Sequence, residues 1–174
     1  DAEGLLIKAV EKENRNINYL LTLSKAQIEN NKYDVALDHL FKAIKVQPNN
    51  VDAVFAICNT YTKKRYYTDA ITYCETALKL NPKDSDFMNR LAWLYAKKGI
   101  NIDRGVQLIK KTLDIYPNRS DYIDTLSELY YAQGDIVEAV KEIRKAINLK
   151  PDHAYYKQQL WKFNNVVPKS MVTG

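Results

Sequence analysis

The chain has 174 residues, of which 46% are hydrophobic and 27% are charged, values of a folded protein that exclude wholesale disorder. Five glycines and five prolines are few for an all-β protein, and no apolar run reaches the ~18–20 residues that a membrane-spanning helix needs. The net charge is +5, but the local charge changes sign along the chain, since residues 85–119 are basic and residues 120–153 are acidic. This distribution disfavours a nucleic-acid-binding protein, which more often carries one sustained basic stripe.

Residues 1–16 contain the first predicted helix, in the stretch DAEGLLIKAVEKE. Ala2, Leu6 and Ala9 lie on one face of this helix, at spacings of four and three residues. The same pattern returns later in the chain, where it marks the second helix of a pair. Because no first helix precedes it here, we expect the chain to be cut from a longer protein, with at least one more repeat upstream.

From residue 17 onward the sequence repeats. Pro48, Pro82, Pro117 and Pro151 are 34, 35 and 34 residues apart, and each follows the end of a predicted helix, which a proline cannot continue. Small residues recur at two fixed positions before these prolines: Ala36, Ala70, Gly105 and Ala139 at the first, and Ala43, Ala77, Thr112 and Ala146 at the second. Small side chains let antiparallel helices approach closely, so each unit is predicted to be a pair of packed helices.

The unit resembles the tetratricopeptide repeat (TPR), with IDTLSELYYAQGDIVEAVKEIRKAINLKP (residues 123–151) as the best match. Four units follow one another without gaps: 17–50, 51–84, 85–119 and 120–153. The resemblance implies an all-α fold, a right-handed superhelical solenoid of antiparallel helix pairs. Neighbouring pairs in such an array bury a shared core that one pair alone cannot form.

The sequence departs from the family pattern in two units. The first has Gln27 where a tyrosine is expected. The third has one extra residue in the turn around Ile100, and it carries Gly105 and Thr112 in place of the usual alanines. Because glycine within a helix costs about 0.5–1 kcal/mol relative to alanine, we expect the third unit to be the loosest.

After the last repeat, residues 154–165 (AYYKQQLWKFNN) begin like another first helix but place Trp161 at the position of a small residue. This substitution indicates a C-terminal capping helix, since the terminal units of a solenoid need a different outer face. Residues 166–174 are expected to be a flexible tail.

No constellation of catalytic or metal-binding residues stands out. Cys58 and Cys74 are too few for a disulfide framework, and we expect them to be small buried apolar residues. His39 and His153 are expected to be solvated or incidental, and no phosphate-binding loop, nucleophile elbow or metal motif is present. We therefore expect no enzymatic activity and no cofactor or metal.

In proteins that resemble this one, the first helices line a concave groove that holds a partner's peptide. Steps of three and four residues from the packing leucines place nine residues on that face, and Arg90 lies nearby. These candidate partner-binding residues are Leu21, Lys25, Phe55, Asn59, Asn89, Arg90, Trp93, Asp124, Glu128 and Tyr131. Large apolar residues among amides and charges are typical of hot spots for protein partners. The acidic residues of the fourth repeat suit a basic segment.

The sequence thus favours a protein–protein interaction module or assembly scaffold. The alternative is a regulatory or substrate-docking region of a larger enzyme such as a glycosyltransferase. RNA binding is disfavoured, because the first helices lack a regular pair of base-reading polar residues. Self-association through the open N-terminal half-repeat is a further possibility. Frequent Lys, Asn, Ile and Tyr favour a bacterial source, and a cytoplasmic location is favoured over a periplasmic or membrane-tethered one.

Overall fold

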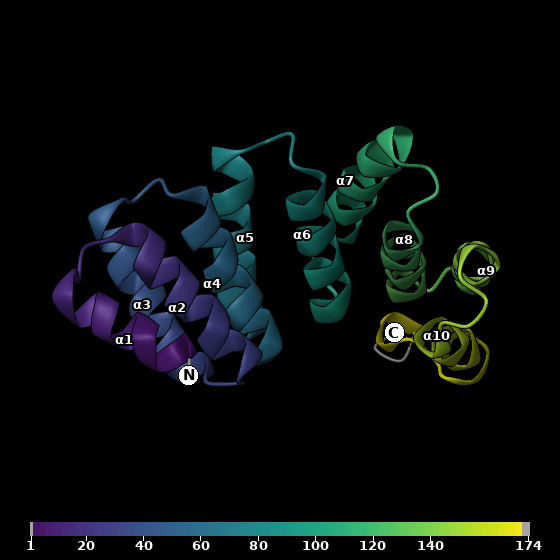
Figure 1. Cartoon of the computed structure of the whole chain (residues 1–174). Helices are drawn as coiled ribbons and strands as arrows, with labels where there is room; N and C mark the ends of the chain where they lie inside the picture. The colour runs from purple at the N-terminus through teal and green to yellow at the C-terminus, as the bar shows by residue number, and fades with distance from the viewer. Residues whose placement is uncertain (1, 172–174) are drawn as a thin grey trace. The chain divides into compact units, whose positions relative to one another are not determined.

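The computed structural model describes residues 2–171, which form ten α-helices and one short 3-10 helix (Figure 1). The chain divides into two compact units, residues 1–82 and 83–174. The helices of the first unit are α1 Ala2–Lys12, α2 Ile17–Glu29, α3 Tyr33–Val46, α4 Val51–Lys63 and α5 Tyr67–Leu80. Those of the second unit are α6 Ser85–Lys98, α7 Ile102–Ile115, α8 Ser120–Gln133, α9 Ile136–Leu149, α10 Ala154–Asn165 and the 3-10 helix η1 Lys169–Met171. Across residues 2–171, no helix has both the length and the apolar character that crossing a membrane requires.

Within each unit, consecutive helices pack as hairpins. In the first unit α2 packs on α3, α4 packs on α5, and α1 lies against α2. In the second unit the pairs are α6 with α7 and α8 with α9, and α10 packs on α9. The contacts of α3 with α4, and of α7 with α8, join successive hairpins. The predicted all-α fold is confirmed, while the division into repeats at residues 50, 84, 119 and 153 stays a prediction.

Polar side chains after the prolines start the first helices. Asn50 and Asp84 cap α4 and α6 by accepting hydrogen bonds from the backbone N–H groups of Ala53 and Phe87. Such caps satisfy donors that have no partner within the helix, and each stabilises by about 1 kcal/mol. The turn from the first to the second helix needs left-handed backbone, which Gly134 supplies with φ 90°.

The small residues of the repeat lie where helices touch. Ala36, Ala70 and Ala139 have no exposed surface, and neither has Thr112. The hydroxyl of Thr112 donates to the carbonyl oxygen of Ile109 at 2.8 Å, so its burial leaves no polar group without a partner. The expectation that these positions are contact points between helices agrees with their complete burial.

Gly105 has the packing role that the small residues of the repeat predict. A Cβ atom added to this glycine in α7 would lie 2.6 Å from Cδ2 of Leu129, a fully buried residue of α8. The glycine therefore permits the close approach of α7 to α8, in addition to weakening its own helix.

Replacing Gly105 by alanine is expected to lower the free energy of unfolding by about 1 kcal/mol. The ~1–3 kcal/mol of overpacking against Leu129 exceeds the ~0.5–1 kcal/mol gained in helix propensity. Urea unfolding measures the difference, with Gln107→Ala at an exposed position of the same helix as the control for a change to alanine without a helix contact. A Gly105→Ala protein more stable than the wild type would contradict the packing role.

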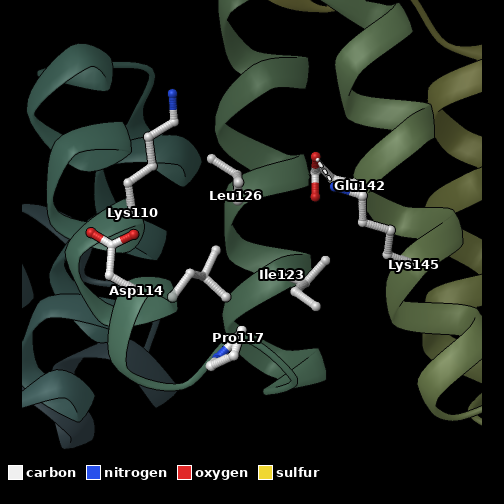
Figure 2. A pocket seen from close by; sticks show the side chains of 8 residues that line it. Lys110, Asp114, Pro117, Ile123, Leu126, Glu142 and Lys145 are labelled. Carbon is white, nitrogen blue, oxygen red and sulfur yellow. Dashed lines mark hydrogen bonds and ion pairs between the residues drawn. The ribbon is translucent and has the colours of Figure 1, made fainter.

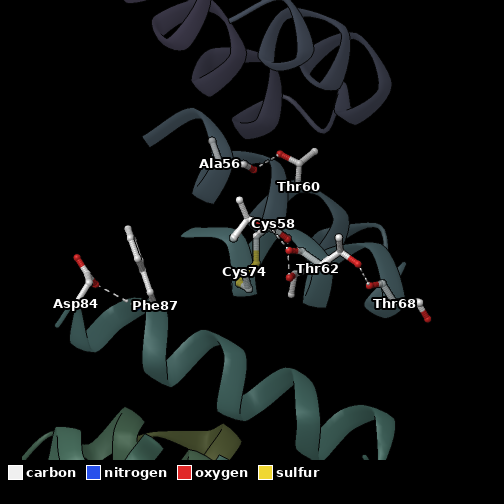
Figure 3. The surroundings of a disulfide bond; sticks show 10 residues. Ala56, Cys58, Thr60, Thr62, Thr68, Cys74, Asp84 and Phe87 are labelled. Carbon is white, nitrogen blue, oxygen red and sulfur yellow. Dashed lines mark hydrogen bonds between the residues drawn. A yellow bond between two sulfur atoms is a disulfide. The ribbon is translucent and has the colours of Figure 1, made fainter. Parts of the chain in front are cut away.

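The two cysteines form a disulfide between α4 and α5 (Figure 3). Cys58 and Cys74 have no exposed surface, and their Cα atoms are 5.3 Å apart. The expectation of burial is confirmed, while the bond between the two residues was not predicted from the sequence. Both residues stand at positions where the two helices of the hairpin touch, and this proximity brings the sulfur atoms together.

The C-terminal residues extend beyond the last hairpin. Helix α10 spans the residues predicted for it, and Trp161 is 64% exposed on its surface. The segment after α10 lies against α8, where the Tyr131 hydroxyl donates to the carbonyl oxygen of Val166 at 2.8 Å and Pro168 is buried. The flexibility of residues 166–174 stays a prediction, and residues 172–174 lie outside the described part of the chain.

Candidate partner-binding site

In the first unit, the predicted site residues lie on α2 and α4, which touch each other. Leu21 is half-buried and packs against two core clusters, so its main contacts are structural. Lys25 is exposed and Phe55 is half-buried. The side-chain oxygen of Asn59 is buried and has no hydrogen-bond partner among the residues that the structure describes.

In the second unit, α6 presents an aromatic ring between two cations. Trp93 is half-buried, and the guanidinium of Arg90 and the ammonium of Lys97 lie 6.0 Å and 5.0 Å from its ring centroid. Residues three positions before and four positions after Trp93 share its helix face, which explains this arrangement. On the same helix, the side-chain oxygen of Asn89 and Nε of Arg90 are buried without a partner in residues 2–171.

Glu128 of α8 joins three helices. Its Oε1 accepts a hydrogen bond from Nζ of Lys97 on α6 at 2.6 Å, and its Oε2 accepts one from Nζ of Lys162 on α10 at 3.1 Å. Gln159 of α10 donates from Nε2 to Oε1 of Glu128, and the hydroxyl of Tyr155 lies 3.4 Å from the same oxygen. Glu128 is therefore an internal carboxylate with several donors, although the sequence analysis placed it on an accessible binding face.

Two carboxylates one turn apart on α8 have pKa values displaced in opposite directions. Burial alone raises the pKa of Glu128, but Lys97 and Lys162 together outweigh it, so this pKa lies below its ordinary value. Burial, followed by the like charge of Glu128, raises the pKa of Asp124 from its ordinary value of 3.8 to about 7. Oδ1 of Asp124 has no hydrogen-bond partner in the described part of the chain.

The raised pKa of Asp124 predicts a pH dependence of stability. The folded state holds this proton up to about pH 7 and the unfolded state releases it near pH 3.8, so the contribution is full below pH 3.8 and is lost as the pH rises toward 7. The wild type should therefore lose about 1–3 kcal/mol relative to Asp124→Asn between pH 5 and pH 8. Urea unfolding of both proteins at each pH measures this difference. A constant difference across that range would contradict the assigned pKa.

Tyr131 is not the exposed groove residue that the sequence predicted. It is 7% exposed, its ring stacks on Phe163 of α10 with 4.8 Å between centroids, and its hydroxyl bonds to Val166. The prediction of exposure is wrong because α10 and the segment after it cover this part of α8. Tyr131 holds the C-terminal helix in place.

Of the two alternatives predicted for His39, solvated or incidental, the structure excludes full solvation. His39 is half-buried on α3, and its Nδ1 lies 3.0 Å from both Oε1 of Gln27 and the carbonyl oxygen of Val35. Burial lowers the pKa of His39. Gln27, which replaces the expected tyrosine, thus has a hydrogen-bonding role inside the first hairpin. Residues 2–171 contain no group of three or more His, Cys, Asp and Glu side chains that could hold a metal ion.

Sequence reasoning missed the contribution of α10 to this site. Tyr155, Gln159 and Lys162 were assigned to a cap, and Lys97 was not among the candidate residues. The available signal was the spacing, since Lys97 and Lys162 are 31 and 34 residues from Glu128. A separation of about one repeat places side chains of successive first helices next to each other.

Comparisons with known proteins agree with this architecture. Tetratricopeptide repeat sequence models match residues 51–84, 73–106 and 121–153. A crystal structure of MamA protein superposes with a TM-score of 0.74 at 22% identity, over 90% of this chain and 85% of that one. A tetratricopeptide repeat protein from Parabacteroides merdae gives a TM-score of 0.82 at 20% identity, over 93% of this chain and 64% of that one. TTC0263, a TPR protein of Thermus thermophilus, gives 0.70 at 18% identity, over 94% of this chain and 89% of that one.

A search of curated protein sequences finds no match. The likeness to solved structures, at identities of 16–22%, shows the fold alone. That fold is an all-α solenoid of helix pairs, and the matched sequence models together cover more than half of the chain. The chain belongs to the tetratricopeptide repeat family.

Proposed function

We propose that this chain is a protein-interaction module that holds a segment of another protein on the first-helix side of its units. One observation carries the proposal. The buried side-chain atoms without a hydrogen-bond partner, among residues 2–171, belong to Asn59, Asn89, Arg90 and Asp124. All four residues lie on first helices, at positions that the sequence assigned to the binding face.

These unpartnered donor and acceptor atoms match the backbone carbonyl and N–H groups of an extended polypeptide. A buried polar atom without a partner costs about 1–3 kcal/mol, and a ligand that supplies the missing partner recovers this free energy. After a side-chain rotation that exposes them, the oxygens of Asn89 and Asp124 would accept hydrogen bonds from backbone N–H groups, and Nε of Arg90 would donate to a carbonyl oxygen. Trp93, on the same helix as Asn89 and Arg90, supplies apolar surface for a side chain.

The charges in the second unit do not favour the basic segment that the sequence suggested. Glu128 already binds two lysines, and the pKa of Asp124 near 7 leaves this residue only partly ionised. Arg90 adds a further cation on α6. The set is net positive, so we propose a neutral or acidic segment as the partner.

A comparison of two tryptophan variants tests the proposal. The chain, Trp93→Ala and Trp161→Ala would be immobilised and exposed to an extract of the source organism, after equal helicity is confirmed for all three. We expect the wild type and Trp161→Ala to retain a common protein that Trp93→Ala loses, because Trp161 lies on the outer surface of α10. Equal retention by all three proteins would argue against the first-helix face as the binding site.

A further inference from the structure

A hollow lies on the side of α8 that carries Ile123 and Leu126, between the second helices α7 and α9 (Figure 2). It has a volume of about 400 Å³. Its apolar floor is formed by Leu113 of α7 and by Ile123 and Leu126 of α8. We call it the α7–α9 cleft, and all of its lining residues belong to the second unit.

Charged side chains surround this apolar floor. Lys110 and Asp114 project from α7, and Glu142 and Lys145 project from α9 (Figure 2). Lys145 donates to Oε1 of Glu142 at 2.7 Å, and the ammonium of Lys110 lies 5.9 Å from the ring centroid of Tyr130. The rim therefore offers two carboxylates as acceptors and two ammonium groups as donors around an apolar floor.

The corresponding place in the first unit lies between α3 and α5. Residues at equal distances before the repeat prolines correspond: Lys110 to Phe41, Glu142 to Tyr73, Leu113 to Ile44, Ile123 to Val54, and Leu126 to Ile57. The floor is thus apolar in both units. At the two positions that border the floor, the first unit has the aromatic rings of Phe41 and Tyr73, and the second unit has the charged side chains of Lys110 and Glu142.

These rings cover the floor of the first unit. The ring centroids of Phe41 and Tyr73 are 6.1 Å apart, and those of Tyr61 and Tyr73 are 5.8 Å apart. Phe41 and Tyr73 pack against the buried cluster that contains Ile57. In the α7–α9 cleft, Lys110 and Glu142 stand in place of these two rings, while Tyr130 corresponds to Tyr61. The floor residues Ile123 and Leu126 keep 4% and 5% of their surface exposed.

We propose that the α7–α9 cleft is a second interaction site, which accepts a tyrosine side chain of a partner protein. The ring would occupy the place that Phe41 and Tyr73 fill in the first unit, against Leu113, Ile123 and Leu126. The phenol hydroxyl would donate to Asp114 or Glu142, an interaction that phenylalanine or leucine lacks. The ammonium group of Lys110 would donate to a backbone carbonyl oxygen beside the tyrosine.

The probe is the blocked tripeptide acetyl-Gly-Tyr-Gly-amide, titrated into the ¹⁵N-labelled chain and followed by NMR. We expect saturable shifts, with a millimolar dissociation constant, for amides of α7, α8 and α9 around the cleft. The same peptide with leucine in place of tyrosine is expected to bind at least ~10-fold more weakly. Free p-cresol, which lacks the backbone, is also expected to bind more weakly than the tripeptide.

Two double variants locate the binding. Lys110→Phe with Glu142→Tyr copies the rings of the first unit into the cleft and is expected to abolish binding of the tripeptide. Lys111→Phe with Glu138→Tyr places the same residue types outside the cleft lining and is expected to bind like the wild type. Glu142→Tyr alone serves if the first double variant loses helicity. Trp93→Ala should still bind the tripeptide, which separates this site from the first-helix face.

Three results would overturn the proposal. The first is an absence of shifts at the highest soluble peptide concentration. The second is equal binding by the wild type and the filled cleft. The third is binding of p-cresol or the leucine peptide as tight as that of the tyrosine peptide, which would assign the cleft to small aromatic molecules or to apolar groups in general.

Discussion

Replacing Glu128 by glutamine should lower the free energy of unfolding by about 2–3 kcal/mol. Removal of one partner from a buried ion pair typically costs about 3–5 kcal/mol, because the other charge stays behind without compensation. A loss smaller than 3–5 kcal/mol is expected here because the side chains of Lys97 and Lys162 are 23% and 33% exposed. Water can therefore partly hydrate the two ammonium groups. Urea unfolding monitored by circular dichroism measures the loss.

The matched control for this substitution is Glu138→Gln on α9. Glu138 also accepts hydrogen bonds from a lysine, Lys141, but that pair is exposed and spans three residues of a single helix. Such a pair contributes about 0.5 kcal/mol or less. If Glu128→Gln were no more destabilising than Glu138→Gln, the three-helix role of Glu128 would be disproved.

Removal of the disulfide should have a similar effect. Cys58 and Cys74 are 16 residues apart, and closing a loop of this length restricts the unfolded chain by about 3 kcal/mol. The double variant Cys58→Ala/Cys74→Ala is expected to lose about that amount, since alanine fits both positions with little strain.

Reduction separates the cross-link from the packing of the side chains. A phosphine reductant is expected to lower the midpoint of the wild type, measured under partly denaturing conditions that expose the bond. It should leave the midpoint of the double variant unchanged. Equal midpoints for oxidised and reduced wild type would show that the cross-link adds nothing to stability.

The fold followed from the sequence because its determinants are local and repeated. Small residues at fixed distances before each proline predicted close helix pairs, and Ala36, Ala70 and Ala139 are fully buried. Gly105 was harder to interpret. Its cost to the helix is a local property, but its clearance from Leu129 depends on the distance between two helices, which the pattern alone does not give.

The candidate site was predicted only in outline. The spacing placed Asp124 and Glu128 on one helix face, but their environment comes from α6 and α10. Whether a carboxylate is exposed or buried between lysines depends on the neighbouring repeats. The prediction that Tyr131 is exposed failed for the same reason. Its position in the repeat is that of a groove residue, but the C-terminal helix α10 covers it.

The disulfide between α4 and α5 also bears on where this chain works. Thiol-reducing systems of the cytosol remove most structural disulfides, and such bonds persist in the periplasm and outside the cell. A buried cross-link at the centre of a hairpin is therefore typical of exported proteins, and the compartment of this chain stays a prediction. Material produced in a reducing cytosol would be the less stable dithiol form, and oxidative refolding or export during expression should precede any measurement of partner binding.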